Sequence, residues 1–101
     1  MSKDKLPPVH PGEVLNLDFL EPMGITPYRL AKDIGVTPSR IHAIVHGERA
    51  ITAETALKLA RYFGVDPVSW MNLQTRYELD VAQDALEGSL EAIKPHEPVA
   101  A

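Results

Sequence analysis

The chain has 101 residues, 45% of them apolar, no cysteine and a formal net charge of −4. This length fits one small domain, and the absence of cysteine excludes disulfides, thiol catalysis and cysteine-bound zinc or iron–sulfur sites. The N-terminus lacks an apolar signal core and no apolar run is long enough to span a bilayer, so we expect a cytoplasmic protein without a membrane partner.

The charge is unevenly distributed along the chain. Residues 1–27 hold two basic and four acidic residues, a balance of −2. Residues 28–61 hold six basic and three acidic residues, a balance of +3, and residues 62–101 hold two basic and seven acidic residues, a balance of −5. A basic middle between acidic flanks is typical of a small DNA binder with a separate protein-binding end, and chance fluctuation is the alternative.

The first two expected helices have clear start and stop signals. The first begins at His10-Pro11, because proline suits a first helical turn, and is expected to stop at residues 21–24, Glu-Pro-Met-Gly. The second begins at Thr26-Pro27, where threonine can cap the helix, and ends at Gly35, which is placed for a left-handed cap. Residues 1–9 ahead of them are expected to form an extended N-terminal arm.

Three further helices repeat this pattern. The third runs from Thr37-Pro38 to Gly47, the fourth from Thr52 to Gly64, and the fifth from Asp66-Pro67 to a point before Gly88. No alternating pattern predicts a strand. We therefore expect an all-α fold of five helices, with a domain over residues 10–82 and a helix end and flexible tail over residues 83–101.

The connection between the second and third helices indicates a function. Gly35-Val36-Thr37 is a turn of about three residues in which glycine can adopt a positive φ, valine can enter the core and threonine can cap the next helix. This spacing is typical of a helix-turn-helix, whose second helix lies in the major groove of DNA.

The segment YRLAKDIGVTPSRIHAIVHGERAITAETALKLARYFGV, residues 28–65, resembles the lambda-repressor-like helix-turn-helix of the Cro/cI (XRE) family. Its flanks, HPGEVLNLDFLEPMGIT and DPVSWMNLQTRYELDVA, resemble those of HigA-type antitoxins, so the resemblance covers roughly residues 9 to 82. Many family members have glutamine where this chain has Pro27, and their phosphate contact cannot be carried over. The positions that carry the resemblance are Leu30-Ala31, Gly35-Val36-Thr37, Ile41, Ile44, Gly47, Leu59-Ala60 and Phe63-Gly64.

The resemblance implies a five-helix lambda-repressor-like domain with a C-terminal extension helix. It also implies an antitoxin that neutralises a RelE-like, mRNA-cleaving toxin and represses its own operon by binding a palindromic operator in double-stranded DNA. Two alternatives stay open. One is a stand-alone XRE-family repressor without a toxin, and the other is a protein-interaction module that has lost DNA binding.

Helical geometry independently assigns a DNA-facing side to the third helix. At about 100° per residue, Ile41, Ile44 and Val45 fall together on the core side. The opposite side is expected to face base edges and phosphates, and ordinary solvated surface is the alternative. With the helix start and the segment beyond it, the expected DNA contacts are Thr37, Pro38, Ser39, Arg40, His42, Ala43, His46, Arg49 and Thr52.

Among these residues, Arg40 could read guanine and Ala43 could contact a thymine methyl group. Histidine side chains can gain charge at mildly acidic pH, so if His42 and His46 touch DNA, binding should tighten as the pH falls from about 7.5 to 6. The two histidines could also clamp zinc, but no spacing recommends a third ligand, and Ala43 replaces the glutamate of zinc proteases. We expect no metal, no cofactor and no enzymatic activity.

The fifth helix carries an apolar stripe. The stripe includes Trp70, Tyr77, Val81 and Leu86, which we expect to form a dimer or partner interface. Packing of Trp70 against the chain's own domain is the alternative. A homodimer is expected, because paired recognition helices read half-sites about one helical turn apart.

Overall fold

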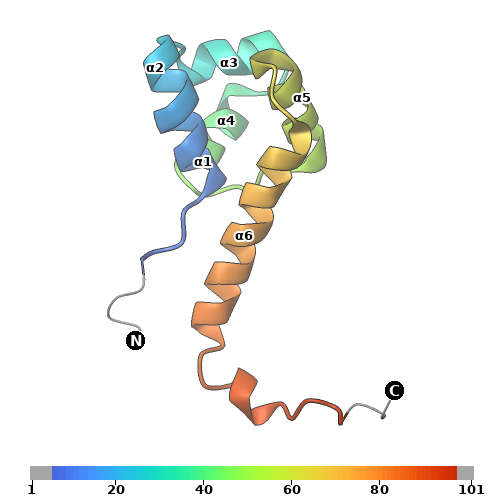
Figure 1. The fold of residues 1–101 in the computed structure, drawn as a ribbon. Coiled ribbons are helices and arrows are strands. Elements are labelled where there is room, and N and C mark those ends of the chain that lie inside the picture. The colour runs from blue at the N-terminus through green and yellow to red at the C-terminus, as the bar shows by residue number, and fades with distance from the viewer. Residues whose placement is uncertain (1–5, 98–101) are drawn as a thin grey trace.

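A computed structural model describes residues 6–97 of the chain and, over this range, contains helices and no strand. The first three elements are continuous, so they form one helix, and five helices are present as expected (Figure 1). In order, the elements are α1 (Pro11–Val14), the π-helical η2 (Leu15–Leu20), α2 (Glu21–Met23), α3 (Pro27–Ile34), α4 (Pro38–Val45), α5 (Ala53–Phe63), α6 (Pro67–Ala85) and the 3₁₀ turn η3 (Leu90–Ala92).

The first helix passes through Pro22 and ends at Gly24, the last residue of its expected stop. Gly24 has φ 66°, the left-handed conformation that glycine adopts without strain. Ahead of the proline the helix widens into a π-helical turn, in which the N–H of Glu21 donates to the carbonyl of Asn16. Such a turn relieves the clash between a proline ring and the carbonyl four residues earlier, so Pro22 does not break the helix.

Threonine caps begin three of the helices, as the sequence predicts. The Thr26 hydroxyl accepts from the N–H of Arg29 at 3.0 Å, and the Thr37 hydroxyl accepts from the N–H of Arg40 at 3.3 Å. The Thr52 hydroxyl accepts from the N–H of Thr55 at 3.3 Å. Each hydrogen bond satisfies one of the free N–H groups of a helix start, which fixes where α3, α4 and α5 begin.

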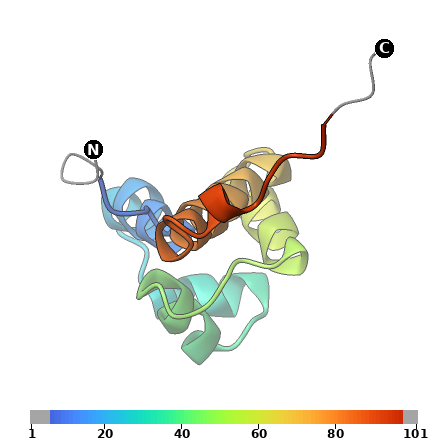
Figure 2. The same ribbon diagram turned by 90° about the horizontal axis from the view of Figure 1, so that it is seen from below.

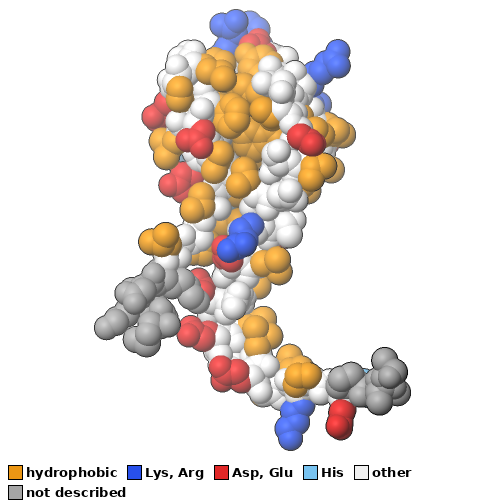
Figure 3. Space-filling view, in the orientation of Figure 1, with side chains coloured by type: hydrophobic (Ala, Val, Ile, Leu, Met, Phe, Trp, Pro, Cys, Tyr) orange, Lys and Arg blue, Asp and Glu red, His pale blue; other side chains and the backbone are white. Residues whose placement is uncertain are grey.

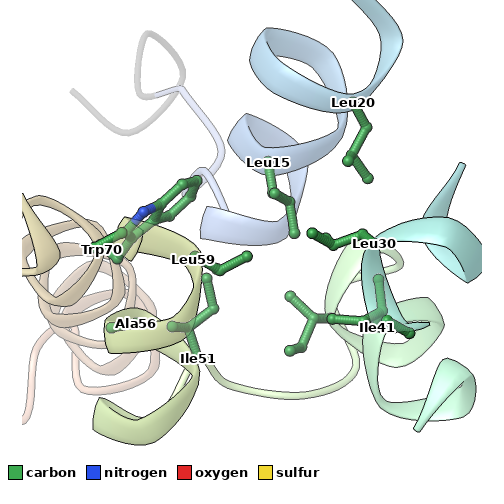
Figure 4. Close-up of a cluster of buried hydrophobic side chains, with 11 residues drawn as sticks. Leu15, Leu20, Leu30, Ile41, Ile51, Ala56, Leu59 and Trp70 are labelled. Atoms are coloured by element: carbon green, nitrogen blue, oxygen red, sulfur yellow. The ribbon is translucent and has the colours of Figure 1, made fainter. Parts of the chain in front are cut away.

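The core lies where the first helix, α3, α4, α5 and the start of α6 meet (Figures 2 and 4). Ile41 and Ile44 of α4 are fully buried and Val45 is half-buried, so the expected rotation of this helix is confirmed. Figure 4 shows several of these side chains converging from different helices. The buried apolar residues are Leu15, Leu20, Leu30, Ala31, Ile41, Ile44, Ile51, Ala56, Leu59, Ala60 and Trp70.

Helix α6 begins in the core and then extends away from it (Figure 1). Trp70 is 2% exposed and packs at 5.2 Å, centroid to centroid, against the ring of Phe19. Trp70 is therefore a core residue of its own domain, which corrects its expected place in a partner interface. Val81 and Leu86, farther along, are 41% and 44% exposed.

No helix in the described range is long and apolar enough to cross a membrane. The expected arm and tail extend over residues 1–5 and 98–101, which lie outside the described residues. Between these ends, the expected division at residue 82 falls inside α6. The division into arm, domain and tail stays a prediction.

Candidate nucleic-acid interface

The turn between α3 and α4 has the geometry of a helix-turn-helix. Gly35 has φ 75°, and the N–H of Val36 donates to the carbonyl of Ala31 at 3.0 Å, which closes the end of α3. The Val36 side chain packs against the core. Thr37 then caps α4, and the hydroxyl of Ser39 donates to the Thr37 hydroxyl at 3.4 Å. These contacts fix the direction of α4 relative to α3.

A shallow hollow of about 440 Å³ lies on the outward face of α4. It is bordered by four of the residues expected to contact DNA, together with Glu48 from the segment that follows. A concave surface with small and polar side chains allows close approach to base edges. The residues that line it are Ser39, His42, Ala43, His46 and Glu48.

Arg40 lies apart from this hollow. It is half-buried and borders a second depression. The other residues that line this depression are the turn at residues 35–37 and Glu54 and Lys58 of α5. Lys58 forms an ion pair with Glu54 at 3.2 Å. In the described part of the chain, the side chains of Arg40 and Arg49 have no carboxylate partner, so both remain available to an anionic ligand.

The two histidines of α4 are stacked on its exposed side. Their ring centroids are 6.1 Å apart with an interplanar angle of 16°, and Nδ1 of His46 lies 2.7 Å from the carbonyl oxygen of His42. No group of three histidine, cysteine or acidic side chains that could hold a metal ion occurs within residues 6–97. Within this range, no third histidine, cysteine or acidic side chain joins the pair.

The segment between α4 and α5 carries Arg49 and Thr52 and is fixed from the side by α6. The N–H of Ile51 donates to Oε1 of Gln74 at 2.8 Å, and Nε2 of Gln74 donates to Glu78 at 2.9 Å. Gln74 is 4% exposed. Sequence reasoning missed this residue, although a polar side chain four positions after Trp70 on the apolar stripe was a usable signal.

His10 contacts the same segment and α6. Its Nδ1 accepts from the N–H of Gly12 at 2.9 Å, and its ring packs edge-on against Tyr77 of α6 at 4.7 Å. Burial lowers the pKa of His10, although a hydrogen bond to the backbone of Arg49 partly opposes this shift. The sequence marked His10 only as a helix start, yet it joins the first helix, the segment after α4 and α6.

Gly12 and Asp33 fix the neighbouring helices. A Cβ at Gly12 would collide with the carbonyl oxygen of Ile44, so only glycine lets the first helix approach the end of α4 this closely.

A hydrogen bond joins α3 to α5. The Tyr62 hydroxyl donates to Asp33 at 2.6 Å. This hydrogen bond, with a smaller effect of Arg29, holds the pKa of Asp33 below its usual range and ties α3 to α5.

Comparisons with known proteins agree with this architecture. A family model described as helix-turn-helix matches residues 18–70. Virulence-associated protein I of Dichelobacter nodosus is 52% identical over 81 residues, which cover 80% of this chain and 75% of that protein. Antitoxin HigA-1 of Vibrio cholerae is 37% identical over 95 residues, which cover 94% of this chain and 90% of that protein.

A solved structure is also similar over most of the chain. It is that of the antitoxin HigA of Pseudomonas aeruginosa with the higBA promoter, and it is 38% identical to this chain with a TM-score of 0.86. The similarity covers 89% of this chain and 99% of that one. The likeness therefore includes α6 as well as the helix-turn-helix.

Proposed function

The chain belongs to the HigA-type branch of the helix-turn-helix family, and from this membership we propose that it is a sequence-specific DNA-binding antitoxin that represses its own operon. The observation that carries this proposal is the outward face of α4, the second helix of a complete helix-turn-helix, which presents a hollow bordered by small and polar side chains. In this account the protein is a cytoplasmic regulator and not an enzyme.

We propose that α4 enters the major groove and that its flanks contact phosphates. The start of α4 carries the positive end of the helix dipole, which favours a phosphate nearby, and Arg40 and Arg49 supply further positive charge. The proposed DNA contacts are Thr37, Pro38, Ser39, Arg40, His42, Ala43, His46, Arg49 and Thr52.

A homodimer is part of this proposal. Paired recognition helices double the contacts and read a palindromic operator. The exposed apolar side chains of Val81 and Leu86 and the half-buried ring of Tyr77 support a protein contact along α6. Trp70 is left out, because it is already buried in the domain core.

The proposed protein partner is a RelE-like, mRNA-cleaving toxin. The naming of the Vibrio cholerae relative as an antitoxin supports this partner. The balance of −5 over residues 62–101 is also complementary to a basic ribonuclease. A stand-alone repressor is the second candidate, because the relative that is 52% identical carries a different description, virulence-associated protein I.

DNA binding can be tested with a labelled duplex of the promoter region upstream of the chain's own gene, measured by fluorescence anisotropy over a range of salt concentrations. We expect a steep loss of affinity with salt, because phosphate contacts release counterions. Arg40→Ala should weaken binding by about 1–3 kcal/mol if the guanidinium reads a base, or reduce the salt slope by about one if it contacts a phosphate.

The matched control is Arg76→Ala, since Arg76 is exposed on α6 and pairs there with Asp80 at 3.3 Å. Unchanged affinity, base preference and salt slope for Arg40→Ala would contradict the assigned face. The toxin partner is tested separately, by co-expression with the product of the adjacent reading frame. Co-purification and relief of growth arrest are expected, and failure of both would favour the stand-alone repressor.

A further inference from the structure

The contact between the two stacked histidines fixes the tautomer of His46. Its Nδ1 lies 2.7 Å from the carbonyl oxygen of His42. A carbonyl oxygen only accepts hydrogen bonds, so Nδ1 must carry the hydrogen. In the neutral ring, Nε2 then has a free lone pair and acts as an acceptor. The exposed His46 therefore presents an acceptor to whatever enters the hollow.

One other polar group around the hollow, Glu48, has the same preference, whereas the Ser39 hydroxyl and the His42 ring can each donate or accept. An ionised Glu48 carboxylate only accepts. Ala43 contributes no polar group, and the hollow is open enough for a base edge to approach it.

This set of groups distinguishes between the bases. In the major groove, adenine and cytosine present exocyclic amino groups as donors, whereas guanine and thymine present keto oxygens as acceptors. A keto oxygen and Nε2 of His46 are both acceptors, so neither could supply the hydrogen of a hydrogen bond between them, and both would lose their bonds to water. A phosphate is excluded for the same reason, because its oxygens accept and the Glu48 carboxylate repels it.

We propose that the hollow lined by Ser39, His42, Ala43, His46 and Glu48 reads the exocyclic amino group of an adenine or a cytosine, with Nε2 of His46 as the specificity-determining acceptor. The inference rests on the proposed function, because it assumes that the outward face of α4 lies in the major groove. It adds the class of base that one position of each half-site must contain.

The test is selection from a library of duplexes with about 20 randomised base pairs, a length that spans two half-sites one helical turn apart. Selection is performed at pH 7.5 with the full chain, His46→Phe and His46→Lys. The control is His96→Phe, the same ring substitution at an exposed histidine of the tail. Circular dichroism and the melting temperature establish that each variant folds.

For the unmodified chain, we expect one position per half-site at which adenine or cytosine binds about three- to tenfold more tightly than guanine or thymine, the range of one hydrogen bond. His46→Phe should abolish the preference at this position only. His46→Lys, which can only donate, should reverse it towards guanine or thymine. His96→Phe should select the same sites as the unmodified chain.

Unchanged base preferences for His46→Phe at every position would overturn the inference and leave the proposed function intact. A uniform loss of affinity with His46→Phe, without a change of preference, would assign His46 to the DNA backbone and overturn it as well. If the unmodified chain enriches no sequence, sequence-specific binding itself fails, and the inference fails with it.

Discussion

The molecule has two regions that differ in how far their apolar side chains are buried. They are the head, residues 11–74, and the stalk, residues 75–97. The head contains all the buried apolar residues, and threonine caps begin its helices α3, α4 and α5. The stalk is helical to Ala85 but leaves large apolar side chains exposed, among them Leu79 at 61% and Ile93 at 68%. Figure 3 shows Lys and Arg side chains at the end of the head away from the stalk, and mainly Asp and Glu along the stalk.

The two parts of helix α6 differ in the same way. The first part of α6 completes the head through Trp70 and Gln74, whereas its second part leaves Leu79 and Val81 exposed. Large apolar side chains left exposed on a projecting helix are typical of a protein contact. We therefore propose that the head reads DNA and that the stalk contacts another chain.

The largest expected difference between the two regions is in stability. Ile41→Ala in the head should lower the free energy of unfolding by about 2–5 kcal/mol, because it leaves a cavity behind α4. Val81→Ala in the stalk should change it by less than about 0.5 kcal/mol in a monomer. Urea denaturation at low protein concentration measures both, and similar losses would remove the distinction.

A smaller effect is expected at the junction of head and stalk. Gln74→Leu leaves the buried N–H of Ile51 without its acceptor, which should cost about 1–3 kcal/mol of stability. It should also weaken DNA binding through Arg49 and Thr52, whose segment loses its support. Gln83→Leu, the same change at an exposed site of α6, is the control. Equal stability of the two variants would show that the hydrogen bond does not fix the segment.

The smallest effect is the pH dependence at His10. Burial holds the pKa of His10 below its ordinary value of 6.5, so the unfolded chain binds this proton more readily than the folded chain. Stability should therefore be fully present above pH 6.5 and should decline as the pH falls from there towards the lowered pKa. Melting temperatures between pH 8 and 5 measure this decline.

Two variants, His10→Gln and His96→Gln, test whether His10 causes this pH dependence of the melting temperature. The first should flatten the dependence between pH 6.5 and 5, and the second, at an exposed histidine, should preserve it. A slope that survives His10→Gln unchanged would assign the proton to another group.

Much of the head could be predicted from the sequence because local chemistry determines it. Thr26 and Thr37 cap their helices through their own hydroxyls, and Gly35 adopts a positive φ at a position defined by its neighbours. The rotation of α4 follows from the spacing of its two isoleucines, both fully buried. Such features depend on residues only a few positions apart.

What the sequence did not predict depends on contacts between distant residues. The hydrogen bond from Ile51 to Gln74 and the packing of His10 against Tyr77 join elements that no local pattern connects. Trp70 was expected at a partner interface because a helical stripe does not tell where the domain core ends. The separation of Arg40 from the histidine hollow likewise depends on the approach of α5.

The central claim is that the head, and not the stalk, reads DNA. The most direct measurement is a titration of the ¹⁵N-labelled chain with its promoter duplex, followed by amide chemical shifts. We expect the largest shift changes over residues 37–52, with residues 76–97 nearly unchanged at saturating dimer concentration. Changes centred on residues 76–97, with α4 unaffected, would contradict it.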